Sequence, residues 1–167
     1  RSTMAIIGGL LKMGFTVKFW PDNLWYDPVY TPQLQQLGVE VIYGSKHVGR
    51  FKQWLMAADG CVSHVLLNRP HIAVNYVDTL EAFPDIQVVY YGHDLHFERL
   101  QREYAISPSA ALEKDIEHFY RLESTIWSKV DAVLYPSQEE AETVKHILPS
   151  ANVAAVSPYV YEGLDAF

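Results

Sequence analysis

Two histidines and an aspartate follow an apolar run near the middle of the chain. Residues 86–91 are mostly apolar, β-branched or aromatic, and Gly92 separates them from His93, Asp94 and His96. Such a run is typical of a strand buried on both faces of a parallel sheet, and a glycine lets the chain turn where the strand ends. The polar groups that follow lie at the carboxyl edge, where open α/β sheets bind ligands. We predict that His93 hydrogen-bonds a ligand; a buried structural histidine is the alternative.

The same three polar residues could in principle hold a metal ion. Two histidines and a carboxylate suit zinc or non-haem iron. The His-Asp-x-His spacing is a weak signal by itself, and the sequence has no other evident ligand cluster. We therefore predict no metal and no cofactor. A metal-dependent hydrolase built on His93, Asp94 and His96 is the third hypothesis, and insensitivity to chelators would exclude it.

Further polar residues follow two other apolar runs. Asn68, Arg69 and His71 come after residues 61–67, and Ser137 comes after residues 131–136. Arg69 and His71 could pair with a phosphate or carboxylate, although Arg69 could equally pair with one of the 20 acidic residues. A helix cap is the simpler interpretation of Ser137, because a glutamate three residues on completes a capping box.

Composition excludes several classes of function. The chain has 167 residues and a formal net charge of -7, so it offers no basic stripe for nucleic acid and little attraction to an anionic membrane. No apolar run approaches the roughly 20 residues of a membrane span. Cys61 is the only cysteine, which excludes an internal disulfide and fits a reducing, cytoplasmic location. We expect a single domain over residues 1–167.

Helical and strand patterns alternate along the whole chain. We predict helices over 2–13, 32–38, 49–59, 72–82, 108–130 and 138–148, and strands over 16–20, 39–44, 61–67, 86–91, 131–136 and 152–156. The longest helix carries apolar residues at helical spacing, namely Leu112, Ile116, Phe119, Ile126 and Val130. Alternation of this kind predicts an α/β protein of the Rossmann-like class, with three α/β/α layers and a mainly parallel sheet.

Four aromatic residues gather in and beside one predicted loop. They are Trp20, Trp25, Tyr26 and Tyr30. Exposed aromatic rings there would suit stacking on a sugar or on an apolar acceptor. Packing beneath a long loop is the alternative interpretation.

Four stretches resemble the amino-terminal domain of GT-B glycosyltransferases of the family 4 type. They are IIGGLLKMGFTVKFWPDN, LGVEVIYG, VVYYGHDLHFERL and VDAVLYPSQEEAETVK, and their order and spacing carry the resemblance. It implies transfer of a sugar, with retention, from a nucleotide-sugar donor to a glycan, polysaccharide or lipid acceptor without a metal. It implies that His93 is catalytic and reaches the donor sugar or its pyrophosphate. The implied substrate-binding residues are Arg1, Asn68, Arg69, His71, Asp94 and Ser137.

The chain departs from this family at both ends. The family usually begins with a strand and a Gly-rich loop, of which Arg1 would be a remnant, and ends with a carboxyl-terminal donor domain. We therefore expect a fragment with little or no transfer activity alone, from an enzyme that could be peripheral to the membrane. The alternative is a non-catalytic Rossmann-like module that binds a sugar or a protein. The absent first strand would leave sheet edges through which the chain could self-associate.

Overall fold

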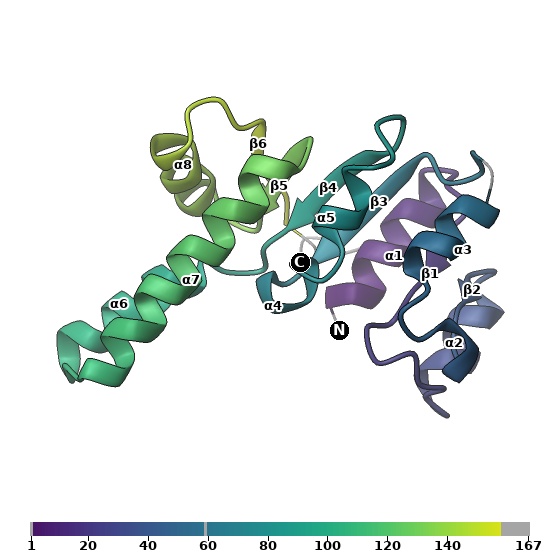
Figure 1. Ribbon diagram of the computed structural model, residues 1–167, viewed down its shortest axis with the longest axis horizontal. Helices are drawn as coiled ribbons and strands as arrows, with labels where there is room; N and C mark the ends of the chain where they lie inside the picture. The colour runs from purple at the N-terminus through teal and green to yellow at the C-terminus, as the bar shows by residue number, and fades with distance from the viewer. Residues whose placement is uncertain (1, 59, 158–167) are drawn as a thin grey trace, which may run out of the picture. The chain divides into compact units, whose positions relative to one another are not determined.

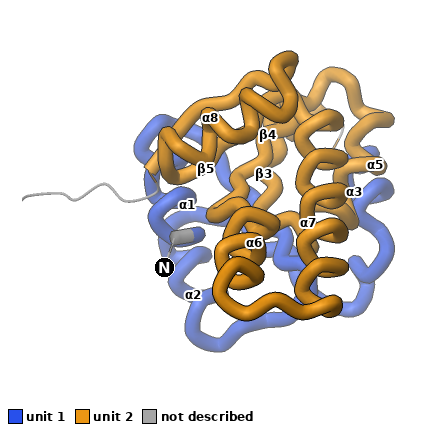
Figure 2. Tube along the Cα trace, turned by 90° about the vertical axis from the view of Figure 1, so that its left-hand side faces the viewer, with its two compact units in different colours: residues 1–57, 158–167 blue, residues 58–157 orange. Residues whose placement is uncertain are grey.

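The computed structural model describes residues 2–58 and 60–157. The chain divides into two compact units, unit 1 up to Ala57 and unit 2 over Ala58–Ser157 (Figure 2). Both units consist of helices and parallel strands (Figure 1). None of the described helices combines the length and the apolar character needed to cross a membrane.

The described part of unit 1 contains a short two-stranded sheet and three α-helices. Its elements are α1 (Ser2–Lys12), β1 (Lys18–Phe19), α2 (Tyr30–Gln36), β2 (Glu40–Val41), the 3-10 helix η1 (Ser45–His47) and α3 (Phe51–Ala57). The two strands are parallel, and each is shorter than the sequence predicted. Ile7 of α1, Leu34 of α2, and Val39 and Val41 at β2 form the buried core, which fixes both helices on the sheet.

The start of α2 differs from the prediction. The sequence predicted a helix over 32–38, but the helix begins at Tyr30. The carboxylate of Asp27 accepts hydrogen bonds from the backbone N–H groups of Val29 and Tyr30, each at 2.8 Å. Thr31 Oγ1 accepts from the backbone N–H of Asp27 at 3.0 Å. Asp27 therefore satisfies two donors at the start of the observed helix.

Unit 2 is a four-stranded parallel sheet with helices between its strands. Its elements are β3 (His64–Asn68), α4 (Pro70–Ala73), α5 (Val77–Leu80), β4 (Gln87–Tyr91), α6 (His96–Ile106), α7 (Ala110–Lys129), β5 (Ala132–Tyr135), α8 (Gln138–Ile147) and β6 (Val153–Ala155). The strand order is β3-β4-β5-β6. This confirms the predicted α/β, Rossmann-like class, although the described strands form two sheets, one in each unit.

The register of the sheet brings the carboxyl ends of its strands together. Asn68, the last residue of β3, lies opposite Tyr91, the last residue of β4. Tyr91 in turn lies opposite Leu134 of β5. Because all four strands are parallel, the residues that follow β3, β4 and β5 meet at one edge. The helix α7 packs against α4, α5 and α6, and α8 packs against β5 and β6.

Two helical regions of unit 2 differ from the prediction. The helix expected over residues 72–82 is split into α4 and α5. Asn75 lies at the break, and an asparagine competes with the helical backbone for hydrogen bonds. We expected Ser107 and Pro108 to open the long helix, but Ser109 caps α7, its Oγ accepting from the N–H of Leu112 at 3.2 Å. The sequence did not predict α6, which lies beside α7 (Figure 1).

Candidate functional site

His93 lies directly beyond the carboxyl end of β4, in a backbone conformation that side chains seldom adopt. Its φ is 59°, in the left-handed region where a residue other than glycine is uncommon. Its Nε2 atom lies 3.2 Å from Oδ1 of Asn68, the last residue of β3. The ring packs edge-on against Tyr91, with 4.8 Å between ring centroids. The fold therefore holds the imidazole from two adjacent strands.

Gly92 serves a different purpose from the one we predicted. The left-handed turn falls on His93 and not on the glycine. A Cβ atom at Gly92 would lie 2.2 Å from Cε1 of Tyr135, far inside van der Waals contact. Tyr135 is fully buried, and its hydroxyl accepts a hydrogen bond from Trp127 Nε1 at 3.1 Å, so the ring cannot easily move. Gly92 is needed for this close approach.

Arg69, the first residue after β3, is also strained. Its φ is 63° and its ψ is 135°. The next residue is Pro70, and a residue before proline normally has a negative φ. Conformations of this kind cost roughly 1–3 kcal/mol and cluster at functional sites. The strained residues Arg69 and His93 thus follow two adjacent strands, and the side chain of each can donate hydrogen bonds.

Burial lowers the pKa of His93, and the positive charge of Arg69 lowers it further. The negative charge of Asp94 acts in the opposite direction but is outweighed. The imidazole is therefore neutral at neutral pH. When its Nε2 donates to Asn68, the Nδ1 atom keeps a lone pair that can accept a hydrogen bond from a hydroxyl.

Asp94 and His96 contribute to the start of α6. Asp94 Oδ1 lies 3.4 Å from His96 Nδ1, and Asp94 Oδ2 lies 3.3 Å from Arg99 Nη1. The carboxylate of Glu123 accepts hydrogen bonds from the backbone N–H groups of His96 and Phe97, at 3.1 and 3.2 Å. The pKa of His96 is raised, first by the carboxylate of Glu123, whose Oε1 atom lies 3.7 Å from His96 Nδ1. These groups fix the helix that follows the candidate site.

Glu123 is not among the residues predicted from the sequence, although the sequence contains a signal for it. The apolar positions of α7 recur three or four residues apart, and they skip one expected position between Phe119 and Ile126. Glu123 occupies it and is fully buried. A carboxylate at an inward position of an otherwise apolar helix face indicates a buried partner.

Ser137 caps α8, as its sequence context predicted. Its Oγ accepts from the backbone N–H of Glu140 at 3.2 Å and donates to Glu140 Oε2 at 2.8 Å. Glu140 Oε1 accepts from the backbone N–H of Leu95 at 3.2 Å. Glu140 therefore connects the start of α8 to the loop after β4, and Ser137 reaches that loop through Glu140.

The other predicted site residues have different places. His71 lies exposed in α4, and no hydrogen bond or ion pair between described residues joins it to His93. Arg1 lies outside the described residues. Within residues 2–58 and 60–157, no three histidine, cysteine, aspartate or glutamate side chains gather where they could hold a metal ion. The candidate site therefore consists of Asn68, Arg69 and His93.

No protein-family model matches the chain, and no curated protein matches it. The function therefore rests on the chemistry of the residues just described.

Proposed function

We propose that this chain is the acceptor-side domain of a glycosyltransferase. The enzyme transfers a sugar from a nucleotide-sugar donor to a glycan, polysaccharide or lipid acceptor, with retention at the anomeric carbon. The observation that carries the proposal is the strained, neutral imidazole of His93, hydrogen-bonded to Asn68 at the carboxyl edge of a parallel sheet. This edge is the usual ligand-binding edge of such sheets.

Sugar transfer needs groups that orient the donor and stabilise the departing diphosphate. A neutral imidazole whose Nε2 donates to Asn68 can accept a hydrogen bond from a sugar hydroxyl at Nδ1 without itself changing charge. Asn68 positions that imidazole, and preorganised hydrogen-bonding groups of this kind lower the barrier because they need no rearrangement during the reaction. The planar guanidinium of Arg69 suits two phosphate oxygens at once.

The described site has too little positive charge to hold a nucleotide diphosphate alone. Arg69 is its exposed cation, whereas Arg99 is paired with Asp94. We therefore assign most of the nucleotide contacts to a second, donor-binding domain, and expect little or no transfer by the 167-residue chain by itself. The exposed, unpaired thiol of Cys61 fits a reducing compartment, so we place the reaction in the cytoplasm.

A non-catalytic binding module is the second candidate. In unit 2, β3 is an edge strand, yet it carries the consecutive apolar residues Val65, Leu66 and Leu67. Apolar runs of this kind are more typical of central strands, and an open edge can accept a strand from a partner. This candidate predicts partner or sugar binding without turnover.

Turnover by the native gene product tests the proposal. The product, isolated from its own cells, would be incubated with UDP-, GDP- and ADP-sugars, and release of nucleoside diphosphate would be measured. Release that depends on an added or co-purifying acceptor supports the proposal. The intact mass separates the two candidates, because a glycosyltransferase needs about 350 residues or more, enough for two ordinary domains. A gene product of that size that releases no nucleoside diphosphate from any donor would contradict the glycosyltransferase proposal.

A further inference from the structure

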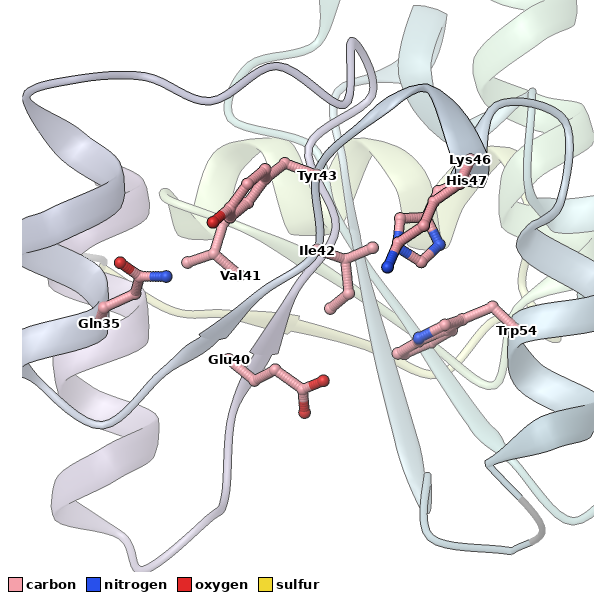
Figure 3. A pocket seen from close by; sticks show the side chains of 8 residues that line it. All are labelled: Gln35, Glu40, Val41, Ile42, Tyr43, Lys46, His47 and Trp54. Carbon is pink, nitrogen blue, oxygen red and sulfur yellow. The ribbon is translucent and has the colours of Figure 1, made fainter.

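Unit 1 has a hollow of about 380 Å³ along β2 (Figure 3). Residues 40–43 form its floor, Gln35 of α2 lies on one side, and Trp54 of α3 lies on the other together with Lys46 and His47 of η1. The volume falls near the lower end of the roughly 300–1,000 Å³ typical of small-molecule sites. The hollow lies wholly within unit 1 and shares no residue with the candidate site around His93.

Aromatic rings hold one wall of the hollow in place. The ring of Trp54 lies 5.3 Å from that of Trp20, centroid to centroid, and is stacked near Phe51 at 6.2 Å with 17° between the planes. Trp20, which the sequence placed among possible stacking residues, therefore packs inward and supports Trp54. Because neighbouring rings fix the indole, little conformational freedom is lost when a ligand packs on it.

The other end of the hollow is also aromatic. Tyr43 packs edge-on against Tyr26, with 5.1 Å between ring centroids. Between the two ends lie the buried aliphatic side chains of Val41 and Ile42. A ligand that fills the hollow must therefore offer apolar surface to the aromatic rings at its two ends and to the aliphatic side chains between them.

Polar groups surround this apolar floor. Gln35 can both donate and accept hydrogen bonds, whereas Lys46 donates. Glu40 accepts, and its charge is balanced by an ion pair with Lys18 of β1. A purely apolar ligand would strip water from these groups without replacing their hydrogen bonds, which is unfavourable. A polyanion would meet Glu40 and find little uncompensated positive charge.

A neutral saccharide fits both requirements. Its hydroxyl groups donate and accept hydrogen bonds, and the C–H face of a pyranose ring suits the negative face of an indole. We infer that this hollow binds a neutral saccharide of one or two sugar residues, with Trp54 as its stacking platform. This inference rests on the proposed function in one respect. In a glycosyltransferase with this acceptor-side domain, the sugar bound in the hollow is part of the acceptor.

Direct sugar binding to the 167-residue chain tests the inference. The probes are methyl α-glucoside, N-acetylglucosamine and maltose, followed by ligand-observed NMR and by tryptophan fluorescence. We expect saturable binding of at least one probe. Trp54→Ala should weaken it by about threefold to tenfold, the effect of losing one aromatic contact, while Trp54→Phe retains most of it. Gln35→Ala, at an exposed helix position where folding is not at risk, should also weaken binding.

Two controls make the result specific. Trp25→Ala removes a ring that is 75% exposed and does not line the hollow, so sugar binding should be unchanged. His146→Ala, at an exposed histidine of α8 in unit 2, should also leave sugar binding unchanged. The assay uses free sugars and no nucleotide sugar, so its outcome is independent of the turnover that tests the proposed function. No saturable binding of any probe overturns the inference, and so does binding that neither Trp54→Ala nor Gln35→Ala weakens.

Discussion

Nε2 of His93 lies 3.2 Å from Oδ1 of Asn68, and the two residues belong to the ends of neighbouring parallel strands. The contact therefore depends on the register between β3 and β4, and not on local sequence. It fixes the imidazole while burial and Arg69 keep it neutral. Such a histidine acts through directed hydrogen bonds and not through positive charge.

Asn68→Asp should change the charge of His93. A carboxylate within hydrogen-bonding distance favours the imidazolium form, so the pKa of His93 should rise by about one unit or more. The measurement is an NMR titration of the histidine ring protons. Asn75→Asp, at an exposed asparagine between α4 and α5, is the matched control and should leave His93 unchanged. An unaltered His93 pKa in Asn68→Asp would contradict the contact.

Glu123→Gln should destabilise the start of α6. Each carboxylate oxygen of Glu123 accepts from one backbone N–H, that of His96 or that of Phe97, and an amide replaces one of these oxygens with an NH₂ donor. The amide also cannot pair with the imidazolium of His96. We expect the free energy of unfolding to fall by about 3 kcal/mol, as for a broken buried pair. Denaturant unfolding measures it. Glu117→Gln removes an exposed charge paired with Arg121 on the same helix and should cost less than about 1 kcal/mol.

The cost of Glu123→Gln should depend on pH. Because the folded state raises the pKa of His96 above 6.5, the stabilisation from the pair is complete below that value and is lost as the pH rises through the raised pKa. The variant should therefore differ most from the unsubstituted protein on the acidic side. A difference that grows with rising pH would contradict the assignment.

Gly92→Ala should destabilise unit 2, because the new methyl group would overlap the ring of Tyr135. Overpacking of a rigid core costs about 1–3 kcal/mol and occasionally more. In a Tyr135→Leu background the same substitution should cost less, and the double-mutant cycle measures that coupling. Gly9→Ala is the control, since nothing lies within 4 Å of its added Cβ in α1, and stability there should rise slightly. Equal costs of Gly92→Ala in both backgrounds would exclude the overlap.

Ser137→Ala should lower the free energy of unfolding by about 1 kcal/mol through loss of the α8 cap. Ser128→Ala, within the last turn of α7, removes no cap and should have a smaller effect. If Ser137 acts only as a cap, turnover measured well below the unfolding temperature should hardly change. A large loss of turnover at unchanged stability would instead support a substrate contact of Ser137, which the resemblance of this chain to family 4 glycosyltransferases implies.

Much of the fold followed from local patterns. Alternating apolar runs and helical spacing identified the parallel strands of unit 2, and Ser137 with Glu140 marked the start of α8. The sequence did not reveal α6, because the residue that satisfies its first N–H groups is Glu123, 27 positions from His96. A cap supplied by a distant helix leaves no local signal.

The candidate site was predicted less completely than the strands. His93 and Asn68 were identified because polar residues after parallel strands meet at one edge. Their contact distance depends on strand register, which sequence spacing does not determine. The role of Gly92 was predicted wrongly, since its real constraint is the ring of Tyr135, 43 positions later on another strand.

Turnover of the His93→Ala variant tests the central proposal most directly. The native gene product and the variant would be compared by release of nucleoside diphosphate from the active nucleotide sugar, with His146→Ala, an exposed histidine of α8, as the matched control. Loss of a positioned hydrogen-bonding group should lower turnover more than about tenfold in His93→Ala and leave His146→Ala unchanged. An unchanged rate in His93→Ala would contradict the role assigned to this histidine.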